Sequence, residues 1–181
     1  RGTFEVAGTS GRALDGVPVR RRDSREEVRT DATGRASLRS RSSVVSAWQL
    51  YRDGLVTQVQ QAYIPGVAAY TQSFTMLPRE AAVIRAASAG GTITGKHGLA
   101  LTLPPNALMT PGGGSVDISL TPLDTAGSEI TAAPDSTFLL QPWDYNNETI
   151  LSYGMAELVV RQSGTETVAN LIQPATLDIP L

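Results

Sequence analysis

The sequence predicts an all-β protein built from two small β-sandwich domains of the Greek-key type in tandem. Many short segments alternate apolar with polar residues, turn-forming residues separate them, and no long segment shows a helical stripe. The chain has 181 residues, of which 41% are hydrophobic, and this is enough to bury a core in one large or two small domains. We expect one domain over residues 1–79 and the second over residues 80–181.

Seven strands are expected in the first domain, each ended by a turn. Asp31 and Gly34 occupy the first and last positions of one turn, where these residue types are favoured. Asp53-Gly54 tolerates positive φ and predicts a hairpin, and Ser46, Trp48 and Leu50 share one face with Val44. The expected strands are Thr3–Ala7, Val17–Arg22, Val28–Thr30, Ala36–Arg39, Val44–Tyr51, Leu55–Tyr63 and Tyr70–Leu77.

The second domain also consists of short expected strands separated by turns, and its sequence shows no internal repeat. Pro104-Pro105 ends a strand because proline cannot donate to a ladder, and Asn106–Met109 is expected to form a single helical turn. The alanine-rich window Glu80–Ala89 lacks an N-cap and a 3.6-residue stripe, so we interpret it as a strand. The expected strands are Ala82–Ala86, Thr92–Thr94, Leu99–Leu103, Val116–Thr121, Thr137–Gln141, Met155–Arg161 and Thr176–Ile179.

Composition excludes several kinds of chemistry. Without cysteine the chain has no disulfide, thiolate nucleophile or Cys-ligated metal, and with only His97 it has no site of two imidazoles. His97 lies in a Gly-flanked turn with no partner nearby in sequence, so we expect an exposed turn residue and not a catalytic base. No apolar run approaches the ~20 residues that span a bilayer. We expect a protein that is not an enzyme; a hydrolase using Asp135 and Asp144 is the alternative ranked last.

Charge is unevenly divided along the chain. Residues 1–80 have a net charge of +4 and residues 81–181 a net charge of −6. Opposite fields of this kind favour head-to-tail contact between copies, and the alternative is two solvated surfaces of unlike composition. The run Arg20–Arg22 is interrupted by Asp23 and Glu26, which is typical of an exposed strand and turn. We therefore expect no nucleic-acid partner.

Two stretches resemble known families. Gly16-Val17-Pro18-Val19 and Thr30-Asp31-Ala32-Thr33-Gly34 resemble the carboxypeptidase regulatory-like family, a transthyretin-like β-sandwich, over residues 3–79. Arg20–Arg22 depart from it, because the family usually has small and apolar residues there. Gly90–Thr94, Leu99–Leu108 and Val116–Thr121 look like a ZU5-type β module, which extends over residues 83–160.

The resemblance implies a function as well as a fold. The tandem order is similar to segments of cartilage intermediate layer protein and of large bacterial surface proteins. It implies a non-catalytic, extracellular structural or adhesive segment, secreted or at the cell surface, and it implies no ligand or cofactor. The chain starts at Arg1 without a leader-like segment, so we expect any targeting segment to lie outside this sequence.

A ligand site is the second hypothesis for function. Trp143, Tyr145 and Tyr153 could stack on a sugar ring or anchor a protein, or could complete a core with their polar tips in water. Asn147 begins a glycosylation sequon. Calcium is the one metal considered, because it needs only oxygen ligands, but no acidic loop has the diagnostic spacing. The scattered acids are Asp124, Glu129, Asp135, Asp144 and Glu148.

Edge strands provide the mechanism for the structural hypothesis. The outer strand of a sheet has unpaired amide and carbonyl groups that can accept a strand from a partner. We expect the terminal segments to act this way, in a homo-oligomer that grows end to end or with neighbouring domains of a larger surface assembly. The residues concerned are Thr3, Phe4, Glu5 and Val6 at one end and Thr176, Leu177, Asp178 and Ile179 at the other.

Overall fold

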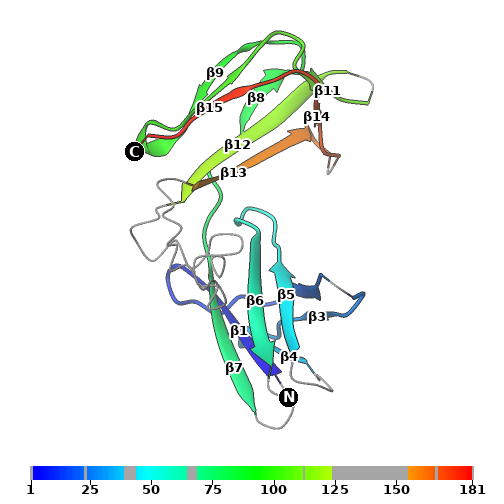
Figure 1. The fold of residues 1–181 in the computed structure, drawn as a ribbon, viewed down its shortest axis with the longest axis vertical. Helices are drawn as coiled ribbons and strands as arrows, with labels where there is room; N and C mark the ends of the chain where they lie inside the picture. The colour runs from blue at the N-terminus through cyan, green and yellow to red at the C-terminus, as the bar shows by residue number, and fades with distance from the viewer. Residues whose placement is uncertain are drawn as a thin grey trace, which may run out of the picture. The chain divides into compact units, whose positions relative to one another are not determined.

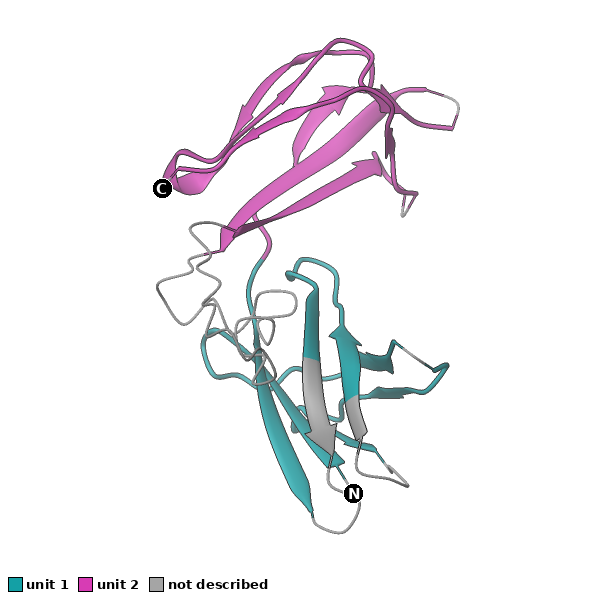
Figure 2. Cartoon of the chain, in the orientation of Figure 1, with its two compact units in different colours: residues 1–78, 126–151 teal, residues 79–125, 152–181 magenta. Residues whose placement is uncertain are grey.

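The computed structural model describes residues 2–22, 24–38, 44–64, 69–111, 113–123, 155–165 and 167–180, with backbone alone for 44–45 and 61–64. The described part of the chain is all-β apart from one 3-10 turn, which confirms the predicted fold class (Figure 1). It divides into two compact units: unit 1 ends at Pro78 and unit 2 begins at Arg79 (Figure 2). We describe each unit by itself.

Unit 1 contains two sheets. In the first, β1 lies between β4, which is antiparallel to it, and β7, which is parallel. The second has the order β3-β2-β5-β6 and is antiparallel throughout. The strands are β1 Gly2–Gly8, β2 Pro18–Arg21, β3 Glu27–Arg29, β4 Arg35–Leu38, β5 Val44–Leu50, β6 Gln58–Ile64 and β7 Tyr70–Met76.

The core of unit 1 is aromatic at its centre. Phe4 of β1 packs against Trp48 of β5 and Phe74 of β7, with ring centroids 5.1 and 5.3 Å apart and the rings tilted. Because these strands come from both sheets, the contacts join the two layers into a sandwich. The remaining buried apolar residues of this cluster are Val6, Val17, Val19, Ala36, Leu38, Leu50 and Met76.

The turn between β3 and β4 forms as the sequence predicts. Asp31 accepts hydrogen bonds from the Thr33 amide (2.8 Å) and hydroxyl (2.6 Å) and from the Arg35 amide (3.1 Å). The Thr33 hydroxyl is the main reason why the pKa of Asp31 lies below its ordinary value. Gly34 completes the turn with φ +75°, a conformation that L side chains rarely adopt.

Unit 2 is a second sandwich, made of two three-stranded sheets and a short strand pair. The sheets have the orders β13-β12-β8 and β15-β10-β9, and every pairing in them is antiparallel. The short pair is β11 with β14. The strands are β8 Val83–Ala86, β9 Gly91–Thr94, β10 Ala100–Leu103, β11 Leu108–Met109, β12 Ser115–Leu123, β13 Met155–Gln162, β14 Asn170–Leu171 and β15 Thr176–Asp178, and η1 spans Lys96–Gly98.

The core of unit 2 is aliphatic. Alternate residues of β10 and β12 face each other across the sandwich, and the buried set is Ala87, Ile93, Leu99, Leu101, Leu103, Ala107, Leu108, Val116, Ile118, Leu120 and Ala169. On the opposite face of β13, Glu157 forms a two-hydrogen-bond ion pair with Arg79, at 2.8 and 3.1 Å. Both side chains of this pair are largely buried.

Three sequence predictions need correction or extension. The strand expected over Leu55–Tyr63 begins only at Gln58, because the amide of Val56 donates to the carbonyl of Leu77, outside the pairing of β6 with β5. The helical turn expected over Asn106–Met109 is wrong: Asn106 is left-handed (φ 59°) and β11 follows it. The strand β14 was not expected. The expected strand Thr137–Gln141 lies outside the described residues.

Candidate functional site: the open sides of unit 2

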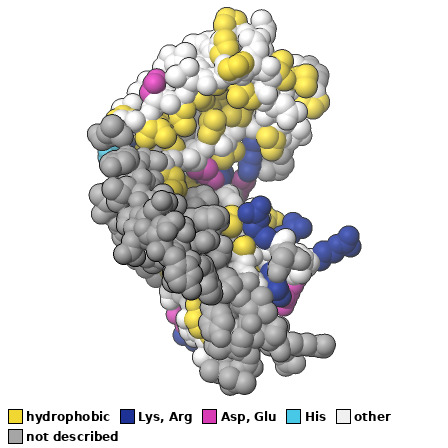
Figure 3. Space-filling view, in the orientation of Figure 1, with side chains coloured by type: hydrophobic (Ala, Val, Ile, Leu, Met, Phe, Trp, Pro, Cys, Tyr) yellow, Lys and Arg dark blue, Asp and Glu magenta, His cyan; other side chains and the backbone are white. Residues whose placement is uncertain are grey.

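Exposed apolar side chains are concentrated on unit 2. Ten large apolar residues in the described part of the chain are exposed, and nine of them belong to unit 2. Figure 3 shows apolar side chains gathered over unit 2 between β15 and β13. The nine are Val83, Ile84, Met109, Leu158, Val168, Leu171, Ile172, Leu177 and Ile179.

The first open side is the one between β13 and β15, which we call the β13–β15 side. Leu158 of β13 is paired with the core residue Leu120, so it faces the interior of the sandwich, yet it is 41% exposed. Leu177 of β15 is paired with the core residue Leu101 and is exposed to a similar extent. Ile179 continues the same alternation. The core of unit 2 therefore reaches the surface along this side.

The edge of β13 also offers backbone groups. Val160 and Gln162 use their outward groups to bond the segment that follows β13: the amide of Ala169 donates to Val160, and the amide of Gln162 donates to Thr167. In a strand every second residue points its backbone groups to the same side, so Ala156 and Leu158 point outward too. Within the described residues no backbone partner meets these two. Among the described residues, the β13 edge is thus bonded at Val160 and Gln162 and unbonded at Ala156 and Leu158.

The second open side lies between β8 and β9, and we call it the β8–β9 side. Arg85 covers one end of it by donating to the carbonyls of Gly90 (3.4 Å) and Thr92 (2.8 Å). The other end holds a cavity of about 300 Å³, and Val83 at its rim is 40% exposed. The lining residues are Glu80, Ala81, Val83, Ile93, Thr94, Gly95, Lys96, Ile118 and Leu120. The β8–β9 side thus contains a cavity, whereas the β13–β15 side carries exposed apolar side chains.

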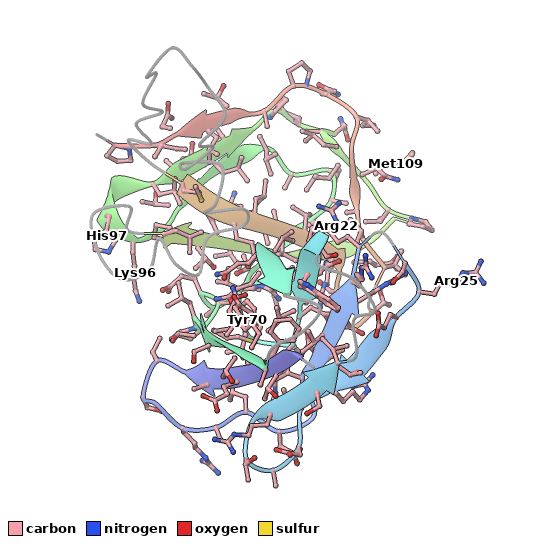
Figure 4. All side chains as sticks on the ribbon, turned by 60° about the horizontal axis from the view of Figure 1, so that its bottom comes forward. Arg22, Arg25, Tyr70, Lys96, His97 and Met109 are labelled. Atoms are coloured by element: carbon pink, nitrogen blue, oxygen red, sulfur yellow. The ribbon has the colours of Figure 1, made fainter. Side chains whose placement is uncertain are left out.

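The charged groups at this cavity are committed to each other. Lys96 Nζ lies 2.6 Å from Glu80 Oε1, and the Glu80 backbone is held by Thr121 and Ser119. His97, the next residue along the 3-10 turn, is exposed and has φ 57° (Figure 4). The arrangement matches the prediction of an exposed turn histidine. Lys96 is the more exposed member of the ion pair, so the rim of the cavity presents a cation to solvent.

A second, shallower cavity of about 360 Å³ lies beside β11 and β14. Met109 at its rim is exposed (Figure 4), and Ile172 is exposed next to it. Thr110, another lining residue, is buried, and its hydroxyl has no hydrogen-bond partner among the described residues. This cavity is a second apolar surface, against which the role of the two open sides can be tested.

Unit 1 presents charge and polarity instead of apolar surface. Arg22 and Arg25 are exposed at the β2–β3 turn, and Arg25 projects away from it (Figure 4). The interior of unit 1 contains polar groups: Gln58 is fully buried and donates to the carbonyl of Thr75. The Tyr70 hydroxyl donates to Gln72 at 2.8 Å, and burial raises the pKa of Tyr70. The Oε1 atom of Gln58 has no hydrogen-bond partner among the described residues, and neither Gln58 nor Tyr70 lines either of the two cavities.

The two predicted terminal strands lie in different positions. Thr3, Phe4, Glu5 and Val6 belong to β1, which is the central strand of its sheet and is paired on both sides. Its removal would take Phe4 and Val6 out of the core. Thr176, Leu177 and Asp178 form β15, which is an edge strand of its sheet, and Ile179 follows it. The structure thus places only the second segment at an edge.

The predicted ligand residues lie outside the described part of the chain. This holds for Trp143, Tyr145, Tyr153 and Asn147 and for the acids considered for calcium, Asp124, Glu129, Asp135, Asp144 and Glu148. Among the residues that are described, no three His, Asp or Glu side chains come together as metal ligands would. No helix in the described ranges is long and apolar enough to cross a membrane.

No family model and no curated protein matches this chain. Among solved structures, it is similar to the Bacillus anthracis TIE protein with a TM-score of 0.37 and 12% identity, over 63% of this chain and 30% of that one. The chain thus spans under a third of that protein's length, and a similarity of this size carries no argument about function.

Proposed function

We propose that the chain is a non-catalytic, extracellular structural or adhesive module whose copies associate through the open sides of unit 2. The observation that carries the proposal is the nine-to-one concentration of exposed large apolar residues on unit 2, several of them beside edge strands. Apolar side chains next to unpaired strand edges are a template for another strand, because pairing buries both the side chains and the backbone groups.

Several features support a contact surface in preference to a reaction site. The charged side chains at the 300 Å³ cavity, Glu80 and Lys96, are bound to each other at 2.6 Å. The single histidine is exposed in a turn. The resemblance of residues 3–79 and 83–160 to carboxypeptidase regulatory-like and ZU5-type modules implies the same kind of role and the extracellular location.

The test is whether the purified chain elongates. Light scattering and electron microscopy over a range of protein concentrations should show particles that grow longer as concentration rises. A chain that stays monomeric up to about 1 mM, where a contact of about 4 kcal/mol is half formed, would contradict the proposal.

A further inference from the structure

We propose that the β15 edges of two copies pair antiparallel about a two-fold axis at Leu177, so that the β15-β10-β9 sheet continues from one copy into the other. This inference rests on the proposed function, and it names the strand and the register through which one open side acts. The direction of the backbone groups, the pattern of the side chains and the state of the neighbouring edges each support it.

The hydrogen-bonding direction of β10 follows from the turn before it. The amide of Gly95 donates to the carbonyl of Leu99 at 2.7 Å, in the register of the β9–β10 ladder. Bonded pairs recur at every second residue of an antiparallel ladder, so Leu101 is bonded toward β9. A side-chain contact agrees: Arg85 donates to the carbonyl of Thr92 at 2.8 Å, and the alternation directs this carbonyl away from β10.

Leu177 consequently points its backbone groups outward. The β10 residues that are not bonded to β9 are bonded to β15 instead, where their partners are Thr176 and Asp178. Leu177 lies between these two, so its amide and carbonyl point away from the sheet, as do those of Ala175 and Ile179. Among the described residues, no backbone group bonds to these outward groups.

The same three residues carry the apolar side chains of this edge. Leu177 is paired with the core residue Leu101 and is 40% exposed, and Ile179, in the same alternation, is 38% exposed. Ala175 is half-buried and packs against the core of unit 2. A strand that pairs with this edge therefore buries apolar side chains and satisfies backbone groups at the same residues.

A second copy of β15 is complementary to the first. With Leu177 opposite Leu177 in an antiparallel pair, Ala175 lies opposite Ile179 on one face and Thr176 lies opposite Asp178 on the other. Apolar residues then meet only apolar residues, and the Thr176 hydroxyl donates to the Asp178 carboxylate of the second copy. Three bonded pairs exchange about six backbone hydrogen bonds.

The neighbouring registers are less favourable. Pairing through the same outward groups can shift only by two residues at a time. One shift sets Asp178 opposite Asp178, and like charges directly opposite each other are destabilising. The other sets the polar Gln173 opposite Ile179. The sequence of this edge therefore favours the register centred on Leu177.

Two other edges of unit 2 are already engaged. On β9 the carbonyl of Thr92 accepts from Arg85, and β13 is bonded at Val160 and Gln162 by the segment that follows it. The outer side of β15 has no such bonds from the residues that the structure describes. We therefore place the contact in the β15-β10-β9 sheet alone, without continuation of the β13-β12-β8 sheet.

The contact is isologous, because each copy presents the same strand to the other. It joins two copies and leaves the β8–β9 side of each copy for the further contacts that elongation needs. Because the paired strand is short, we expect a weak contact, at the small end of specific interfaces.

Sedimentation velocity of the full chain tests the edge. Leu177→Arg places a charge at the centre of the contact, and Leu171→Arg, at an exposed leucine of β14 outside both open sides, is the matched control. A two-fold contact contains each substitution twice, so a loss of about tenfold per copy raises the dissociation constant of this contact about a hundredfold. The control should associate like the wild type.

A pair of cysteine variants tests the register, and it decides the question even if Leu177→Arg fails to fold. The chain has no cysteine, so Thr176→Cys and Asp178→Cys supply the only thiols, both at exposed positions. Directly opposite Cα atoms of a non-bonded pair are about 4.5 Å apart, within disulfide range, whereas identical positions lie on a diagonal of about 7–8 Å. Under mild oxidation a one-to-one mixture should therefore form the mixed disulfide, identified by mass spectrometry, in preference to either self-disulfide.

The two experiments separate this inference from the proposed function. Leu177→Arg that associates as well as the wild type overturns the inference alone, as does Asp178→Cys that crosslinks to itself as readily as to Thr176→Cys. Wild type that stays monomeric up to about 1 mM overturns the proposed function instead.

Discussion

Removing the carboxylate of Glu157 should destabilise unit 2 much more than removing an exposed carboxylate destabilises unit 1. Glu157 accepts hydrogen bonds from Arg79 at 2.8 and 3.1 Å, and the two side chains are only 12% and 10% exposed. In Glu157→Ala the Arg79 guanidinium stays in the same enclosed position without the carboxylate that offsets its loss of hydration.

The magnitude follows from this burial. Removing one partner of a buried ion pair costs about 3–5 kcal/mol, and two hydrogen bonds to a charged group, at about 1.5–3 kcal/mol each, give a similar range. Because about a tenth of each side chain still reaches water, we take the lower end, about 3 kcal/mol. In a unit of this size each kcal/mol lowers Tm by about 4–8 °C, so the expected loss is roughly 12–24 °C.

Hydrogen exchange read by mass spectrometry reports each unit separately, and it is combined with a thermal melt. Glu5→Ala is the control: Glu5 lies 2.9 Å from Arg35, but these side chains are 37% and 61% exposed, so its loss should cost no more than about 1 kcal/mol. Faster exchange should be confined to unit 2 in Glu157→Ala. The reasoning is wrong if Glu157→Ala costs less than about 1 kcal/mol or if both variants cost the same.

Two further perturbations test unit 1. Gly34→Ala should lower Tm clearly, because an added Cβ lies 2.5 Å from the carbonyl oxygen of Val6 at φ +75°; Gly54→Ala, with the same φ range and nothing within 4 Å, should have a much smaller effect, and equal effects would contradict the steric argument. The lowered pKa of Asp31 stabilises the folded state above the ordinary value of 3.8, and this contribution is lost as pH falls through the lowered pKa. Asp31→Asn should therefore lower Tm at pH 7 but hardly at pH 2. A Tm difference from wild type that is the same at both pH values would contradict the stabilising role of the Asp31 carboxylate in the turn.

Much of the fold is predictable from the sequence because its signals are local. The Asp31 turn, the Asp53-Gly54 break and the buried face of Ser46, Trp48 and Leu50 depend on residues close together in the chain. The late start of β6 and the pairing of β11 with β14 depend on contacts with distant segments, such as Leu77 with Val56. A local pattern holds no information about such partners.

Predicting the candidate site from the sequence would require contacts between residues that are even farther apart in the chain. Alternation identifies Thr3–Val6 and Thr176–Ile179 equally as strands, but only sheet order shows that the first is central and the second is at an edge. Glutamine is usually found at the surface, and only the fold shows that Gln58 is fully buried. The open sides of unit 2 result from which strands end each sheet, so no motif could have marked Leu158 and Val83.

Cryo-electron microscopy of the assembled chain tests the central claim most directly. If copies associate through unit 2, the map should show neighbouring copies in contact through the β13–β15 side, the β8–β9 side or both. A particle in which unit 2 makes no contact with a neighbouring copy, or a chain that stays monomeric, would contradict it.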